Sequence, residues 1–126
     1  MNTKTLISDQ HFDTVYHIAD LHIRLHHRHD EYSEVIDNLY QDLKVKSEKQ
    51  KGLIVIAGDV LHAYNDLSPE LIEMMMGLLN KLCSLMPVVM IAGNHDANLS
   101  NLNRTDGLTP FERIGLYNNL FYLKLV

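Results

Sequence analysis

Residues 53–59 read LIVIAGD, and this stretch decides the fold class of the chain. Its first five residues are all apolar, and a glycine and an aspartate follow them directly. An unbroken apolar run of this length is typical of a strand buried on both faces, as in a parallel sheet that helices cover. We therefore expect a central strand over residues 53–57, with Asp59 just beyond its carboxyl end.

Three similar runs along the chain predict strands over residues 14–19, 88–92 and 120–125. Helical patterns separate the four strands, which gives the order β-α-β-α-β-α-β. This order predicts an α/β fold with a layered, mostly parallel sheet and right-handed crossovers. We expect one domain over residues 1–126, because a chain of 126 residues is long enough for one hydrophobic core and too short for two.

The helical patterns also carry start signals. Asp30 is the expected N-cap of the first helix. Its apolar face consists of Val35, Ile36, Leu39, Tyr40 and Leu43. The second helix opens with Ser68 as N-cap and Pro69 as its first residue. It is apolar over most of its surface, so we expect it to be buried, with Cys83 and the methionines as core residues. A third, short helix begins at residues 109–112.

The composition of the chain excludes several classes of protein. A net charge of −5 argues against a broad nucleic-acid-binding surface, although a site rich in carboxylate ligands gives the same balance. No apolar run approaches the roughly 18 residues of a membrane span. Residues 1–10 lack the apolar stretch of a secretory signal. The single cysteine, Cys83, excludes an internal disulfide and fits a reducing, intracellular compartment.

Each of the first three predicted strands ends in a polar signature. Asp-Leu-His follows the first at residues 20–22, and Gly-Asp follows the second at residues 58–59, with His62 three residues on. Gly-Asn-His-Asp follows the third strand at residues 93–96. Ligands of open α/β sheets bind beyond the carboxyl ends of the strands. Each signature alone would most often be a turn or a surface loop, but three in order indicate one shared site.

The side chains of these signatures are suitable metal ligands. Asp20 and His22 are two residues apart, so in an extended chain both would point the same way and offer an oxygen and a nitrogen to one ion. The two carboxylate oxygens of Asp59 could bind two ions, and Asn94 adds an amide oxygen. Such a ligand set suits Mn, Fe, Zn or Mg. His95, next to Asn94, would lie near the metals and face a substrate.

In this combination the three signatures resemble the calcineurin-like metallophosphoesterase superfamily. The resemblance spans residues 20–96 and implies two divalent metal ions, a bridging water or hydroxide, and in-line attack on phosphorus. It implies that Asp20 and His22 bind the first metal. It also implies that Asp59 bridges both metals and that Asn94 binds the second. Manganese is the expected ion, with Fe, Zn or Mg as alternatives.

The same resemblance assigns catalytic roles after the third strand. His95 would contact the phosphate and protonate the leaving oxygen, and Asp96 would orient His95. The expected fold is the first half of a metallophosphoesterase sandwich, whose second sheet would lie beyond Val126. The family's later ligands, a His and a Gly-His-x-His, have no counterpart, because no histidine follows His95. We interpret the chain as the amino-terminal part of such a domain, a truncated gene product or a degenerate, non-catalytic scaffold.

A narrower resemblance is to the SbcD-type nuclease subunit of DNA double-strand-break repair complexes. Residues 58–62, GDVLH, and residues 67–70, LSPE, are similar to that group, although Leu61 stands where the group has Phe. In the group, the histidine that matches His62 helps DNA ends reach the second metal. The resemblance implies a DNA substrate and an ATPase partner of the SbcC type, and it is compatible with a homodimer. The alternative is a phosphoesterase acting on phosphoprotein or on a small phosphodiester.

Residues 24–29, RLHHRH, follow the first signature directly and contain two arginines and three histidines. One interpretation is a solvated loop between strand and helix. The other is a local basic contact for a phosphate backbone, despite the negative charge of the whole chain. The lysines between residues 44 and 51 are interpreted as an exposed helix end rather than a binding patch.

Overall fold

The computed structural model describes residues 11–23, 29–60, 68–91 and 119–123, and the strands within them form one four-stranded sheet. The strands are β1 (Thr14–Ile18), β2 (Gly52–Ala57), β3 (Val88–Ile91) and β4 (Leu120–Leu123), hydrogen-bonded in the order β1-β2-β3-β4. Every neighbouring pair is parallel. The predicted α/β class with a parallel sheet is confirmed, and each strand begins within one residue of its predicted start.

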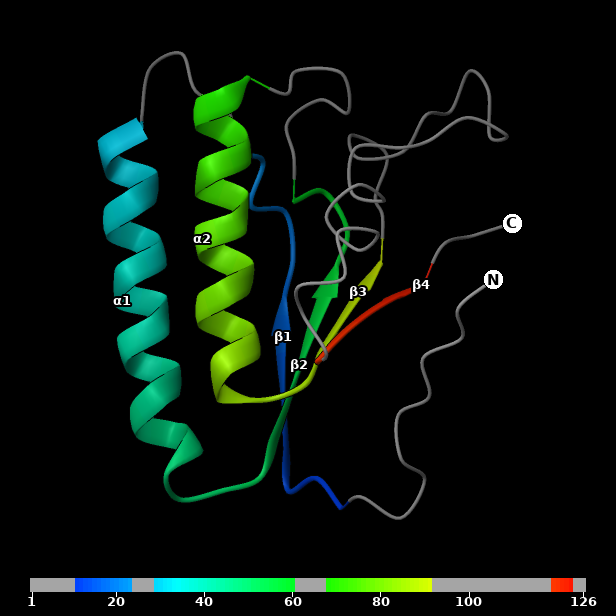
Figure 1. Ribbon diagram of the computed structural model, residues 1–126. Helices are drawn as coiled ribbons and strands as arrows, with labels where there is room; N and C mark the ends of the chain where they lie inside the picture. The colour runs from blue at the N-terminus through cyan, green and yellow to red at the C-terminus, as the bar shows by residue number, and fades with distance from the viewer. Residues whose placement is uncertain (1–10, 24–28, 61–67, 92–118, 124–126) are drawn as a thin grey trace.

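Two helices of the described residues, α1 (His29–Ser47) and α2 (Pro69–Leu85), stand side by side on one face of the sheet (Figure 1). Consecutive parallel strands joined by crossovers of one hand place successive helices on the same side. Lys81 of α2 is ion-paired to Asp37 of α1 at the surface. The helix predicted from residue 109 lies outside the described residues. No helix in the described ranges is long and apolar enough to cross a membrane.

The start of α2 follows its sequence signals. Ser68 has an extended backbone, and its hydroxyl oxygen accepts a hydrogen bond from the N–H of Leu71 at 3.2 Å, while Pro69 occupies the first helical position. The predicted N-cap is therefore confirmed. The helix buries seven residues, and Cys83 is among them as predicted. These residues are Leu71, Met74, Met75, Leu78, Leu79, Leu82 and Cys83.

The boundaries and the buried face of α1 correct two predictions. The helix begins at His29, so Asp30 lies in its first turn, where a carboxylate is favoured by the helix dipole, and is not the N-cap. Ile36 and Leu43 are buried, at 7% and 3% exposure, but Val35 is 55% exposed. Leu39 and Tyr40 are half-buried, so Val35 alone of the predicted face is exposed, and the buried stripe is narrower than predicted.

The two faces of the sheet differ in burial, which corrects the prediction that the central strands are buried on both sides. In β2, Ile54 and Ile56 are fully buried in the core cluster that contains the α2 side chains, whereas Leu53 and Val55 are only partly buried. The strand register aligns five more partly or fully exposed apolar side chains with Leu53 and Val55. These are Val15, Val89, Ile91, Phe121 and Leu123. The helices cover one face, and the other face is partly open and mostly apolar, with the exposed His17 beside Val55.

Candidate metal centre

The chain segments that follow β1 and β2 remain joined by backbone hydrogen bonds beyond the ends of the strands. The N-to-O distances are 3.2 Å from Asp20 to Gly58, 2.9 Å from His22 to Asp59, and 2.8 Å from Ile23 to Val60. Ile23 and Val60 are 1% and 0% exposed and anchor both segments in the core. The predicted ligands of these two signatures therefore lie on one shared backbone frame.

The backbone is left-handed at Asp20, His22 and Asp59, the three predicted ligands that lie within the described residues. The φ angles are 57° at Asp20, 49° at His22 and 52° at Asp59, and no other non-glycine residue in the described ranges has a positive φ. The neighbouring Gly58 has a φ of 92°, a conformation that glycine adopts without the steric cost of a Cβ. A left-handed residue that carries a Cβ costs roughly 1–2 kcal/mol, less for Asp, and such strain gathers at functional sites.

This geometry corrects the expected route by which the first two ligands meet. The prediction assumed an extended chain through residues 20–22, in which alternate side chains share a side. Instead β1 ends at Ile18, and both Asp20 and His22 adopt the left-handed conformation. The two side chains still converge, but through a turn that the second segment holds in place by hydrogen bonds.

Three side chains from these segments come together at the carboxyl edge of the sheet. The His22 Nε2 atom is 3.7 Å from Oδ1 of Asp20 and 3.9 Å from Oδ2 of Asp59. One possible ligand atom from each residue lies within 4.8 Å of the other two. The side chain of Asp20 is 71% exposed, that of His22 35% and that of Asp59 18%. The group therefore opens to solvent on the side of Asp20.

The donor set fits a divalent ion. Two ligands that bind one ion at about 2.2 Å can be no more than about 4.4 Å apart. The two distances from the His22 nitrogen lie within this limit, so His22 is close enough to either carboxylate to share an ion with it. Two carboxylates and one imidazole suit Mn, Fe, Zn or Mg rather than a metal that prefers thiolates.

Tyr32 supports this group from the first turns of α1. Its hydroxyl donates a hydrogen bond to the main-chain carbonyl oxygen of His22 at 2.8 Å. The ring is partly buried and packs against the hydrophobic core. The sequence did not predict this contact, because the two residues are ten positions apart, with His22 in the turn after β1 and Tyr32 in α1. No periodicity or motif signals a side chain that reaches back to a preceding turn.

The other predicted site residues lie outside the described residues. These are His62, Asn94, His95 and Asp96. β3 ends at Ile91 on the same edge as β1 and β2, and residues 93–96 follow it in the sequence. Of the basic stretch at residues 24–29, the structure describes the backbone of His29, which begins α1. The roles predicted for all of these residues stay predictions.

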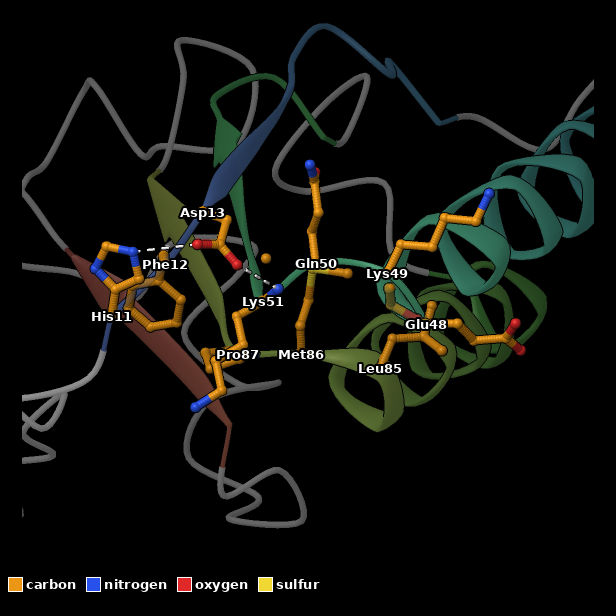
Figure 2. Close-up of a pocket in the computed structure, with 12 residues that line it drawn as sticks. His11, Phe12, Asp13, Glu48, Lys49, Gln50, Lys51, Leu85, Met86 and Pro87 are labelled. Atoms are coloured by element: carbon orange, nitrogen blue, oxygen red, sulfur yellow. Dashed lines mark hydrogen bonds and ion pairs between the residues drawn. The ribbon is translucent and has the colours of Figure 1, made fainter.

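A hollow of about 540 Å³ lies at the opposite, amino-terminal end of the strands (Figure 2). Phe12, Lys51 and Pro87, which stand just before β1, β2 and β3, contribute to its lining. Within it, the Nε2 atom of His11 is 3.1 Å from Oδ1 of Asp13, and the other oxygen of Asp13 accepts a hydrogen bond from the Lys51 N–H. Asp20, His22 and Asp59 are not among the described residues that line this hollow, so it is separate from the group that they form.

A family model for calcineurin-like phosphoesterases matches residues 14–125. The chain belongs to the calcineurin-like phosphoesterase family. This family acts on phosphate esters, and its members use divalent metal ions, which agrees with the carboxylate and imidazole group at the sheet edge. The resemblance drawn from the three signatures is thereby confirmed at the level of the family, and the SbcD-type subgroup stays a prediction.

Two known proteins are similar to this calcineurin-like chain, one in sequence and one in structure. It is 44% identical over 111 residues to "Uncharacterized protein R555" of Acanthamoeba polyphaga mimivirus, a match that covers 87% of this chain. The chain spans about 8% of the length of that relative. A crystal structure of the nuclease MPE of Pseudomonas putida aligns with 87% of this chain and 47% of its own, at 17% identity and a TM-score of 0.49.

Proposed function

We propose that this chain carries part of the active site of a metal-dependent phosphoesterase, and that its substrate is the phosphodiester backbone of DNA. The observation that carries the proposal is the convergence of Asp20, His22 and Asp59 within 4.8 Å at the carboxyl edge of the sheet. The predicted ligand Asn94 and the predicted proton donor His95 follow β3, which ends at the same edge.

Each residue has a distinct part in the proposed chemistry. Divalent ions, when bound, activate water and stabilise charge on the phosphoryl oxygens. Asp20 and His22 would hold the first ion, and the less exposed carboxylate of Asp59 would contribute to both positions, with Asn94 at the second. His95 would donate a proton to the leaving oxygen. The exposure of Asp20 gives a substrate access from the solvent side.

The DNA substrate rests on sequence features. The GDVLH and LSPE stretches are similar to the SbcD-type subunit, and residues 24–29 place two arginines directly after the first ligand pair. Cationic side chains there would attract a polyanionic substrate to an otherwise acidic chain. By the same resemblance we propose an ATPase partner of the SbcC type. Phosphoprotein or a small phosphodiester is the competing substrate class.

Metal binding is the first test of this proposal. Addition of Mn²⁺ should raise the melting temperature of the 126-residue chain by mass action, and Asp59→Asn should remove most of that rise. Asp42→Asn is the matched control, because Asp42 is an exposed carboxylate on α1 that pairs with Lys46. Titrations with Zn²⁺ and Mg²⁺ in parallel would rank the metals. An equal Mn²⁺ effect in the wild type and the Asp59 variant would refute the assignment.

A further inference from the structure

The peptide groups on both sides of the His22 Cα are held by partners from other segments. Its N–H donates to the Asp59 carbonyl oxygen at 2.9 Å, and its own carbonyl oxygen accepts from the Tyr32 hydroxyl at 2.8 Å. The first partner belongs to the segment after β2, and the second belongs to α1. The backbone of His22 is thus fixed by two elements that are distant from it in the sequence.

These two hydrogen bonds hold His22 in a backbone conformation that is otherwise unfavourable. Its φ of 49° is unfavourable for a residue with a Cβ, and such a conformation persists only where surrounding contacts hold it. An extended conformation at His22 would turn the imidazole away from its position between Asp20 and Asp59. The direction of the imidazole therefore depends on the hydrogen bonds that keep the backbone left-handed.

The location of Tyr32 makes its hydroxyl a firm attachment point. The residue lies in α1 near its start, and its ring packs against the hydrophobic core. A partly buried hydroxyl attached to a packed ring has few alternative positions, so it restrains the carbonyl it contacts more strongly than a water molecule could. The next residue after His22, Ile23, is 1% exposed, which fixes the far side of the same peptide group.

We propose that Tyr32 is a positioning residue for the metal ligand His22: its hydroxyl keeps the His22 backbone in the conformation that directs the imidazole toward the two carboxylates. The inference rests on the proposed function, since it assumes that His22 binds a metal ion. Tyr32 contacts the ligand's backbone and would not touch the ion, so its effect would appear in metal affinity and in coordination geometry.

The test compares Tyr32→Phe with Tyr40→Phe in the 126-residue chain. Both changes remove one hydroxyl from a tyrosine of α1, and the Tyr40 hydroxyl makes no hydrogen bond to the part of the chain that the structure describes. Calorimetric titration with Mn²⁺ should show a loss of about three- to tenfold in affinity for Tyr32→Phe, the effect of one part-buried hydrogen bond. Tyr40→Phe should bind Mn²⁺ as the wild type does.

Spectroscopy of the Co²⁺-loaded chain provides a readout that a purely structural role would not change. At saturating Co²⁺, the visible absorption bands of Tyr32→Phe should differ in position or intensity from those of the wild type and of Tyr40→Phe. Unchanged Mn²⁺ affinity and an unchanged Co²⁺ spectrum in Tyr32→Phe would overturn the positioning role. So would a fall in metal-free melting temperature with no change in the metal-induced shift. Absence of Mn²⁺ binding by the wild type would instead refute the proposed metal site itself.

Discussion

The main-chain N–H of His22 donates a hydrogen bond to the carbonyl oxygen of Asp59 at 2.9 Å, while the side chains of the same two residues approach to 3.9 Å. The segments after β1 and β2 are therefore in contact at these two residues through both their backbones and their side chains. A backbone contact of this kind sets the separation of two ligands without using either ligand atom. The hydrogen bond between the two segments therefore limits how far the imidazole and the Asp59 carboxylate can lie apart.

Backbone strain at Asp20 can be measured by comparing Asp20→Gly with Asp20→Ala without metal. The side chain is 71% exposed, so its loss removes little packing, whereas the φ of 57° suits glycine and disfavours alanine. We expect the glycine variant to be more stable than the alanine variant by about 1 kcal/mol in urea denaturation. Both should lose Mn²⁺ affinity to a similar extent. Equal stabilities would mean that residue 20 is not left-handed in solution.

Two glycines should respond in opposite directions to replacement by alanine. A Cβ on Gly52 would lie 2.6 Å from a ring carbon of Tyr16 and 2.8 Å from the sulfur of Met86, so we expect Gly52→Ala to cost about 1–3 kcal/mol. A Cβ on Gly77, within α2, meets no atom within 4 Å. Gly77→Ala should stabilise the chain by roughly 0.5–1 kcal/mol through helix propensity. Thermal unfolding of both variants measures this contrast, which a destabilised Gly77→Ala would contradict.

Substitutions at the adjacent residues Asn94 and His95 should have different effects on metal binding and on the rate of hydrolysis. They are to be compared in a form of the protein that hydrolyses phosphodiesters. His95→Ala should leave the metals bound and lower the rate by about 10²–10⁴-fold, because the leaving oxygen loses its proton donor. Asn94→Ala should instead weaken the second metal, so that excess Mn²⁺ restores part of the rate. Elemental analysis of both variants distinguishes the two effects. Loss of metal from the His95 variant would reverse the assigned roles.

The arginines of residues 24–29 should contribute to DNA binding but not to the hydrolysis of small substrates. Replacement of Arg24 and Arg28 by alanine should weaken DNA binding and flatten its dependence on salt, because fewer counterions are released. Hydrolysis of a small chromogenic phosphodiester should change little. Equal losses on both substrates would indicate that the segment supports the fold rather than the nucleic acid.

Much of this architecture could be predicted because the signals are local. The run LIVIA, the Ser68 cap and the Pro69 start each act through neighbouring residues, and the structure confirms all three. The carboxyl-edge location of Asp20 and Asp59 followed from strand direction alone. Local patterns therefore sufficed for the element order and for part of the ligand group.

The features that could not be predicted depend on contacts between distant segments. The left-handed backbone at His22 is held by Asp59 and by the Tyr32 hydroxyl, and no pattern within residues 20–22 encodes it. The apolar residues of β2 look equally suited to two buried faces, but both helices pack on one side. Val35 appeared to belong to the buried stripe of α1 because periodicity alone does not fix its width.

The open face of the sheet has a consequence for how copies of this chain behave together in solution. Val15 and Leu123, on the first and last strands in the sheet order, are 59% and 56% exposed, and the apolar residues between them extend the same surface. Contiguous apolar area of this kind draws molecules together. The net charge of −5 opposes that attraction, and dissolved salt screens charge without weakening apolar contact. We therefore expect ionic strength to control the association of copies, with dilute salt keeping them apart and concentrated salt favouring their association.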